Sequence, residues 1–359
     1  MALTDIRLQH FRSYEDSSFE LSSGVNIIVG PNATGKTNLL EAVLVIARGG
    51  SYRTRDADLV RFGSEWSRLD VHDDMGRLRT LKLQCSGPVG AQTCKKSFVI
   101  DEKTFLRLSP QKTLPVVLFE PNHLLMLSGS PELRRSYVDD LLEQVSPGFG
   151  TVRRQYKRVL AQRNALLKHG MQMAQSQMFV WNVRLGELAG RIVRERLDLL
   201  ERINNVASDV YGNISGNASS VVRLEYTSPL PLEQYESALM HKYEQNLERD
   251  VILGYTTSGP HREDFRVYLN DHLSQESASR GESRTIVLTL KTIELQLIES
   301  SGGPPPMLLL DDVFSELDGK RRHALTDYLR SYQTFITTTD ADVVVKHFTG
   351  NSNIIPTQR

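Results

Sequence analysis

Apolar residues follow a strand-like pattern near both ends of the chain. Short runs that are apolar, or that alternate with polar residues, stand between Gly, Pro and charged positions, as in strands joined by turns. Before about residue 120 these runs are "GVNIIVG", "RLDVHD", "RTLKLQC", "KKSFVID" and "PVVLFE", and later they are "VVRLEY", "DFRVYLN", "MLLLDD" and "TFITTT". Both ends of the chain are therefore predicted to contribute strands.

The middle of the chain has a helical period instead. Apolar residues recur at every third or fourth position over 152–167 and again over 185–200, which predicts two amphipathic helices. The simplest arrangement is an α/β lobe made from residues 1–121 and 222–359, with a mainly helical lobe, 122–221, inserted between them. No heptad run is long enough for an extended coiled coil.

The stretch "GPNATGKTNLLEAV", residues 30–43, carries the most specific local signal. It matches the pattern G-x-x-x-x-G-K-[ST] without a mismatch, at Gly30, Gly35, Lys36 and Thr37. A predicted buried strand precedes it and a helical apolar period follows it. Because the N–H groups of such a loop and of the helix N-terminus attract anions, the sequence predicts a phosphate-binding loop.

The positions of this loop have different expected roles. Lys36 would neutralise the β- and γ-phosphates of ATP and so serve catalysis, and the Thr37 hydroxyl would hold Mg²⁺. The helix after the loop is expected to turn Glu41 away from its apolar side. The predicted nucleotide contacts are Gly30, Pro31, Asn32, Ala33, Thr34, Gly35, Lys36, Thr37 and Asn38.

Two acidic residues supply the expected second half of the site. The stretch "PPPMLLLDDVFSELD", 304–318, places four apolar residues directly before Asp311 and Asp312. An apolar strand that ends in acids is the usual partner of a phosphate loop. Asp311 would hold Mg²⁺ through water, because hard cations prefer oxygen ligands. Asp312 would act in catalysis by orienting or deprotonating the attacking water.

Ser279, Gly281 and Glu282 form S-x-G-E at the start of a predicted helix, a pattern that alone is also typical of a serine N-cap. The order of phosphate loop, S-x-G-E, apolar strand with acids and S-x-L-D resembles the ABC-type ATPases. The resemblance implies a P-loop ATPase head with an inserted helical lobe. It also implies that these three residues bind nucleotide: the serine and helix N-terminus of one subunit would close on the γ-phosphate held by another. ATP would then join a homodimer.

The overall composition narrows the class of protein. The 359 residues include 43 basic and 43 acidic ones, so net charge points to no partner. Two cysteines, Cys85 and Cys94, predict neither a disulfide framework nor a zinc site, and they fit a reducing compartment. The N-terminus has no apolar signal core, and no run approaches the ~18 apolar residues of a membrane span. We expect a soluble, cytoplasmic protein without a membrane partner.

Charge is unevenly distributed within this balance. Residues 149–196 contain ten basic and two acidic residues. So strong an excess predicts helices with cationic outer faces that bind a polyanion, although a merely solvated face is the common alternative. The candidate DNA contacts here are Arg153, Arg154, Lys157 and Arg158. A rival patch in "RGGSYRTR", close to the phosphate loop, offers Arg48, Arg53 and Arg55.

Four longer stretches narrow the resemblance further: "LQHFRSYED", "GSPELRRSYVDDLL", "GYTTSGPHREDF" and "DDVFSELDGKRRHAL". Together they resemble the RecF family of bacterial recombination-repair ATPases over essentially the whole chain. One departure is Asn122, where the family more usually has an acid. The resemblance implies that Arg12 approaches the nucleotide. It also implies a slow, DNA-dependent ATPase that dimerises on ATP, binds duplex DNA near single-strand gaps, and works with RecR and RecO to load RecA.

Two other classes of protein share the phosphate loop. In a transporter-type ATPase subunit a switch histidine follows the strand that comes after the acidic strand. This chain has Thr337–Asp340 at that place. The basic middle stretch also argues against that class. A structural SMC-like clamp carries hundreds of residues of coiled coil, for which 359 residues leave no room.

Overall fold

The structure, a computed structural model, describes all but a few short stretches of the chain. The described residues are 2–87, 93–340, 344 and 352–357. The chain divides into two compact units, one of residues 1–121 with 294–359 and the other of residues 122–293. Among the helices of the described part, none combines the length and the apolar character needed to cross a membrane.

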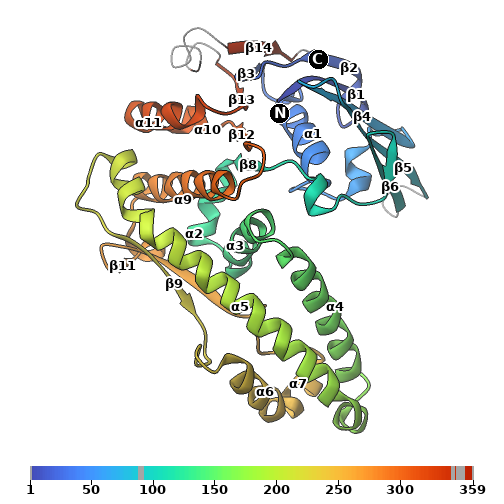
Figure 1. The fold of residues 1–359 in the computed structure, drawn as a ribbon, viewed down its shortest axis with the longest axis vertical. Helices are drawn as coiled ribbons and strands as arrows, with labels where there is room; N and C mark the ends of the chain where they lie inside the picture. Colours follow the sequence, from blue (N-terminus) through green and yellow to red (C-terminus); the bar gives the residue numbers. More distant parts are fainter. Residues whose placement is uncertain (1, 88–92, 341–343, 345–351, 358–359) are drawn as a thin grey trace. The chain divides into compact units, whose positions relative to one another are not determined.

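The first unit contains two sheets (Figure 1). The parallel sheet has the strand order β14 (Ser352–Pro356), β3 (Val25–Val29), β13 (Thr334–Thr338), β12 (Met307–Asp311), β8 (Val116–Phe119). The antiparallel sheet has the order β2 (Tyr14–Glu20), β1 (Leu3–Phe11), β4 (Trp66–Asp73), β5 (Leu78–Ser86), β6 (Thr93–Ile100), β7 (Lys103–Phe105). All the strand-like runs predicted from the sequence are confirmed as strands.

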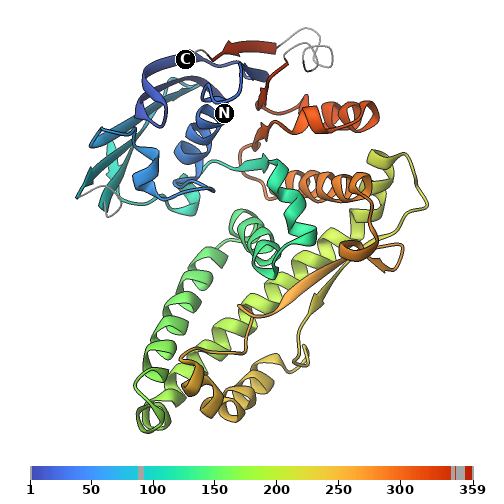
Figure 2. The same ribbon diagram turned by 180° about the vertical axis from the view of Figure 1, so that it is seen from behind.

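Helix α1 (Lys36–Arg48) packs against strands of both sheets, as Figures 1 and 2 show. Its side chains are buried almost all round, and Leu39, Val43 and Ile46 are inaccessible to solvent. A helix that is apolar on every side needs such a sandwiched position. The helix begins just after β3, so its N-terminus lies at the carboxyl edge of the parallel sheet. The described part of this unit also contains η1 (Asp56–Leu59), η2 (Pro110–Lys112), the end of α9 (Arg280–Ser300), α10 (Val313–Glu316) and α11 (Gly319–Leu329).

The second unit is mainly helical. Its helices are η3 (Pro121–Leu124), α2 (Leu125–Ser128), α3 (Pro131–Val145), α4 (Phe149–Leu167), α5 (Met171–Ser215), α6 (Tyr235–Gln245), α7 (Leu247–Leu253), α8 (Ser274–Ser277) and the first part of α9 (Arg280–Ser300). Helices α4 and α5 confirm the two helices predicted from the apolar period. Helix α5 runs for 45 residues and ends at Gly216, whose left-handed backbone directs its N–H to the carbonyl oxygen of Gly212.

The expected boundary at residue 222 needs correction. Strand β9 (Val222–Thr227) pairs with β10 (Asp264–Leu269), which pairs with β11 (His272–Leu273), and these strands form a separate sheet of the second unit. The chain returns to the first unit at residue 294, within α9. Strand-like runs were assigned to the α/β lobe, but their pattern does not say which sheet a strand joins.

The interior of the second unit corrects the expectation that its arginines face outward. The guanidinium of Arg163 is inaccessible to solvent, and it donates to Asp250 Oδ2 at 2.8 Å and to Asn182 Oδ1 at 2.8 Å. Arg196 is also buried and forms two hydrogen bonds with the Asp139 carboxylate, at 2.9 and 3.0 Å. Burying a charge is costly unless it is paired, so these arginines belong to internal ion pairs.

The two cysteines form a disulfide, although the sequence analysis predicted no disulfide framework. Cys85 on β5 and Cys94 on β6 lie directly opposite each other, with Cα atoms 4.0 Å apart, and are joined by a disulfide bond. Two cysteines in a sequence do not reveal that they face each other on two paired antiparallel strands. The pairing depends on the register of the two strands.

Candidate nucleotide-binding site

The phosphate loop turns sharply into α1 at Gly35. This residue has a φ of +99°, in the left-handed region that glycine adopts without strain. A Cβ atom here would lie 2.8 Å from Ser13 Oγ and 3.1 Å from the Tyr14 hydroxyl oxygen. The Tyr14 hydroxyl also donates a hydrogen bond of 3.1 Å to the Gly35 carbonyl oxygen. Both the turn and the close approach of the β1–β2 segment therefore require glycine.

Lys36 lies across the loop that precedes it. Its Nζ donates to the carbonyl oxygens of Gly30 at 2.7 Å and Pro31 at 2.9 Å, and the side chain is buried. This places the ammonium group at the phosphate loop, as its predicted role requires. Of the other predicted contacts, Asn32 and Ala33 lie in the same loop. Asn38 lies in the first turn of α1, and its amide donates to Ser13 Oγ at 3.0 Å.

The C-terminal end of the described chain supports the loop, a contact that no sequence pattern predicts. The hydroxyl of Thr357 is 2.8 Å from that of Thr34, which also donates to the Pro31 carbonyl oxygen at 2.9 Å. A Cβ atom at Gly30 would lie 2.4 Å from Thr357 Oγ1. Thr357 thus fixes one side of the loop, and only its position after β14, beside β3, brings it there.

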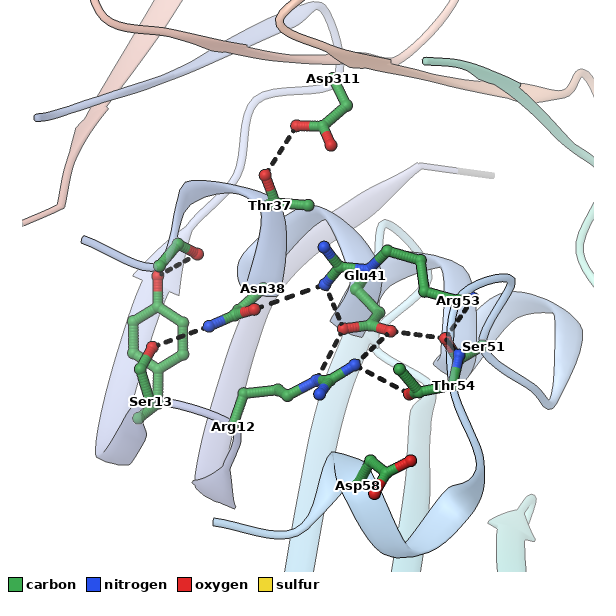
Figure 3. A network of polar contacts seen from close by, with 12 residues as sticks. Arg12, Ser13, Thr37, Asn38, Glu41, Ser51, Arg53, Thr54, Asp58 and Asp311 are labelled. Carbon is green, nitrogen blue, oxygen red and sulfur yellow. Dashed lines mark hydrogen bonds and ion pairs between the residues drawn. The ribbon is translucent and has the colours of Figure 1, made fainter. Parts of the chain in front are cut away.

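The two residues that were predicted to hold Mg²⁺ lie side by side. The Thr37 hydroxyl, at the start of α1, donates to Asp311 Oδ1 at 2.9 Å, at the end of β12 (Figure 3). The two residues are 274 positions apart in the chain, and the parallel sheet unites them. Hydroxyl and carboxylate oxygens are ligands that Mg²⁺ prefers, so these two residues fit a Mg²⁺ site.

Asp312, the predicted catalytic acid, directly follows this strand. It is exposed, and it has a φ of +54° and a ψ of 20°, a left-handed conformation that is disfavoured for a residue with a Cβ atom. Such strained backbone conformations concentrate at functional sites. The left-handed backbone lies at the point where β12 ends and α10 begins.

Glu41 differs from its expected position. The prediction turned it away from the apolar side of α1, but its side chain is fully buried. It accepts hydrogen bonds from Arg12 Nε at 2.9 Å, from Arg53 Nη2 at 2.7 Å and from Ser51 Oγ at 2.5 Å (Figure 3). Arg12 also donates to the Thr54 hydroxyl at 2.8 Å. One buried carboxylate therefore holds arginines from two separate segments.

Electrostatics keeps this carboxylate charged. Burial raises the pKa of Glu41, but the hydrogen bonds from Arg12, Arg53 and Ser51 outweigh it and lower the pKa below its ordinary value. The ion pair fixes Arg12 beside the first turns of α1. Arg53, predicted as a DNA contact, is held at the same place. Of the rival patch, Arg55 is exposed and Arg48 ends α1.

Ser279 and Glu282 cap α9 with reciprocal hydrogen bonds. The Glu282 carboxylate accepts from Ser279 Oγ at 2.7 Å and from its backbone N–H at 2.8 Å. The Glu282 N–H in turn donates to Ser279 Oγ at 3.3 Å. This is a capping box, and Gly281 lies within it. The bonds from the Ser279 side chain and backbone lower the pKa of Glu282.

We expect Ser279→Ala to destabilise the first turn of α9 by about 1 kcal/mol, because the cap hydroxyl is lost. Hydrogen exchange of the first amides of α9, without nucleotide, measures this loss. The pKa of Glu282 is lower in the folded protein than in the unfolded protein. The cap therefore stabilises the helix fully above the unfolded-state pKa, and this stabilisation is lost as the pH falls through the folded-state pKa. The difference between the variant and the unchanged protein should therefore shrink in acid. Equal exchange at pH 7 would contradict a capping role.

The motifs "GSPELRRSYVDDLL" and "GYTTSGPHREDF" meet inside the second unit. Arg134 pairs with Asp264 through bonds of 2.9 and 2.7 Å, and Arg135 donates to the Glu263 carbonyl oxygen at 2.8 Å. The Tyr156 hydroxyl bonds to His261 Nδ1 at 2.7 Å, and burial lowers the pKa of this histidine to about 4. These two motifs build the interior of the unit.

The candidate DNA contacts on α4 divide into two groups. Arg153 contradicts its expected free position, because its guanidinium pairs with Asp140 at 2.6 Å and Glu143 at 3.0 Å and is largely buried. The pattern of basic residues did not show that α3 carries these acids beside it. The other three, Arg154, Lys157 and Arg158, are exposed.

Comparisons with known proteins cover almost the whole chain. Residues 5–100 match a family model described as an AAA domain. The DNA replication and repair protein RecF of Ruminiclostridium cellulolyticum is 32% identical, with 98% of this chain and 96% of that protein covered. RecF of Heliobacterium modesticaldum is 35% identical, with 94% and 92% covered.

Solved structures agree with the sequence relatives. A structure of the recombination mediator protein RecF with ATP, in the RecFOR pathway, matches with a TM-score of 0.81 at 29% identity, over 94% of this chain and 92% of that one. An Smc head bound to a domain of ScpA matches with a TM-score of 0.55 at 16% identity, over 100% and 95%, which shows a shared fold only. The predicted fold, an α/β ABC-type ATPase head, is confirmed, and the residues that the structure describes form no long coiled coil. The chain belongs to the RecF family of DNA replication and repair proteins.

Proposed function

We propose that this protein is an ATP-dependent DNA-binding protein of recombinational repair, acting in the cytoplasm. ATP with Mg²⁺ joins two copies on duplex DNA near single-strand gaps. This complex helps RecR and RecO to load RecA, and it hydrolyses ATP slowly, faster when DNA is bound. The proposed ATPase activity is supported mainly by the hydrogen bond between Thr37 and Asp311, which joins the phosphate loop to the acidic strand.

The geometry around α1 supports ATP as the nucleotide. Lys36 lies against the loop that would hold the phosphates. A cavity of about 740 Å³ opens beside the first turn of α1 and includes Arg12, Ser13, Asn38 and Thr54 in its lining. This volume lies within the range of small-molecule sites, and we assign the nucleoside part of ATP to it.

The residues of the site divide the work of hydrolysis. Bound Mg²⁺ supplies positive charge that stabilises the phosphoryl group during transfer. Thr37 and Asp311 hold the metal, Lys36 neutralises phosphate charge, and Asp312 orients the attacking water. Ser279, at the N-terminus of α9, meets the γ-phosphate held by the second copy. Its hydroxyl then exchanges its bond to Glu282 for a bond to the phosphate.

Sedimentation and DNA binding, each with and without ATP and Mg²⁺, test the proposal. We expect a monomer without nucleotide, a dimer with ATP, and tighter binding to gapped duplex DNA for the dimer. A protein that stays monomeric with ATP and binds DNA equally in both states would exclude an ATP-driven clamp. Stimulation of its ATPase by membranes rather than DNA would favour a transporter-type subunit instead.

A salt titration locates the DNA-binding surface. We expect a variant with Arg154, Lys157 and Arg158 all changed to Ala to bind DNA more weakly and with a flatter salt dependence. Each lost phosphate contact removes about 0.9 from the slope of log affinity against log salt concentration. Because phosphate contacts do not read bases, the loss should be the same for different DNA sequences.

The matched control for this titration is Arg184→Ala. Arg184 is an exposed arginine of the same unit, but it already pairs with Glu187 at 2.9 Å. The slope of log affinity against log salt concentration for Arg184→Ala should therefore equal that of the unchanged protein. If the triple variant also keeps the original slope, DNA lies elsewhere. Arg55→Ala, in the rival patch, would then be the next variant to titrate.

A further inference from the structure

Thr337, on β13, connects the two acids at the end of the neighbouring strand β12. The strands are parallel, and Thr337 pairs in register with Asp311. The Thr337 hydroxyl donates to Asp311 Oδ1 at 2.8 Å, and it accepts a hydrogen bond of 2.9 Å from the backbone N–H of Asp312. A hydroxyl has one proton to donate and lone pairs to accept, so a single side chain makes both bonds.

The first bond fixes the carboxylate that faces the phosphate loop. Asp311 Oδ1 accepts from Thr37 on one side, at 2.9 Å, and from Thr337 on the other, at 2.8 Å. Both partners are hydroxyls held by regular elements, α1 and β13. The carboxylate therefore has a defined orientation before any metal binds, which is the pre-organisation that a metal ligand needs.

The second bond supports a strained backbone. Asp312 has a φ of +54°, in the left-handed region that residues with a Cβ atom seldom adopt and that aspartate enters mainly where local hydrogen bonds support it. Its N–H donates to the hydroxyl of Thr337, a residue that is only 1% exposed, so water has little access to replace the acceptor. A buried N–H left without a partner would add a further penalty. The bond to Thr337 thus favours the left-handed conformation in which Asp312 leaves the strand.

We propose that Thr337 is a positioning residue for ATP hydrolysis, which holds the metal-binding carboxylate of Asp311 and the backbone of Asp312 in their working geometry. The proposal rests on the functions proposed above for the two acids. In this role Thr337 acts through both acids at once, by its bonds to the Asp311 carboxylate and to the Asp312 backbone N–H. Its loss should therefore affect Mg²⁺ use and turnover together, while ATP binding through Lys36 continues.

Two variants without the hydroxyl, and one that keeps it, test this role in the full-length chain. Thr337→Val and Thr337→Ala remove both bonds, and Thr337→Ser retains them. We expect kcat of the first two to fall about tenfold or more, since a hydrogen bond to a charged group is worth about 1.5–3 kcal/mol. The Mg²⁺ concentration for half-maximal activity should rise, the KM for ATP should change little, and Thr337→Ser should recover most of kcat.

Thr334→Val is the matched control. Thr334 lies on the same strand and is fully buried, but its hydroxyl bonds to the carbonyl oxygen of Tyr332 at 3.1 Å, away from the acids. We expect its kcat and Mg²⁺ dependence to match those of the unchanged protein. Thermal unfolding of every variant shows which ones fold, and Thr337→Ala tests the role if the larger Val side chain does not fit.

Three results would overturn the proposal. A folded Thr337→Val or Thr337→Ala protein with unchanged kcat and Mg²⁺ dependence would show that the hydroxyl has no role. An equal loss in Thr337→Ser would assign the effect to packing. An unchanged protein that shows no Mg²⁺-dependent ATPase activity would instead remove the proposed function itself, and the role of Thr337 with it.

Discussion

Changing Lys36 to Ala is expected to abolish ATP hydrolysis and to weaken ATP binding. The Lys36 ammonium lies 2.7 Å from the Gly30 carbonyl oxygen and 2.9 Å from that of Pro31, so the loop itself orients it. Its charge would neutralise phosphate charge that increases towards the transition state. The loss of one charged contact of about 3 kcal/mol corresponds to about 100-fold in affinity, and the loss in turnover should be larger.

The measurements are phosphate release and calorimetric ATP binding. Lys36→Arg should retain more ATP binding than Lys36→Ala but should still lose hydrolysis. A planar guanidinium cannot reproduce the point charge of an ammonium at the same place. Lys82→Ala, an exposed lysine of β5, is the control and should behave like the unchanged protein. Normal ATPase activity of folded Lys36→Ala would refute the assignment of this loop.

The site was predictable from the sequence where its signals are local. The glycines and Lys36 form one continuous motif, and an apolar run marks the strand before Asp311. Both signals come from neighbouring residues, because the turn and the buried strand impose their own requirements on the sequence. Thr357 could not be predicted in this way, since it reaches the loop only after β14 has paired with β3.

Charged side chains were the harder case, because their direction depends on distant partners. Glu41 was placed outside on the assumption that a polar residue in a helix faces water. Its partner Arg12 lies 29 positions away. The attraction between the opposite charges offsets the cost of removing the Glu41 carboxylate from water. Arg163 likewise depends on Asp250, 87 positions away. The excess of basic residues in one stretch of the sequence therefore did not show which basic side chains are exposed and which form buried ion pairs.

Separating the two acids gives the second large effect. We expect Asp312→Asn to bind ATP and Mg²⁺ almost normally and to hydrolyse ATP about 100-fold or more slowly, since general acid–base catalysis contributes about 10²–10⁴-fold. The amide keeps the size of the side chain but cannot accept a proton from water. Asp311→Asn should also weaken Mg²⁺ binding, because it removes the charge next to the Thr37 hydroxyl.

Titration of ATPase activity against Mg²⁺, together with ATP binding in the presence of Mg²⁺, distinguishes these outcomes. High Mg²⁺ should partly restore Asp311→Asn, whose defect is one of affinity, and should leave Asp312→Asn inactive. The structure supports this asymmetry: Asp311 is half-buried between two hydroxyls, whereas Asp312 is exposed on a left-handed turn beyond the strand. An identical Mg²⁺ dependence of the two variants would mean that the acids act as one unit, with no division between metal binding and the activation of water.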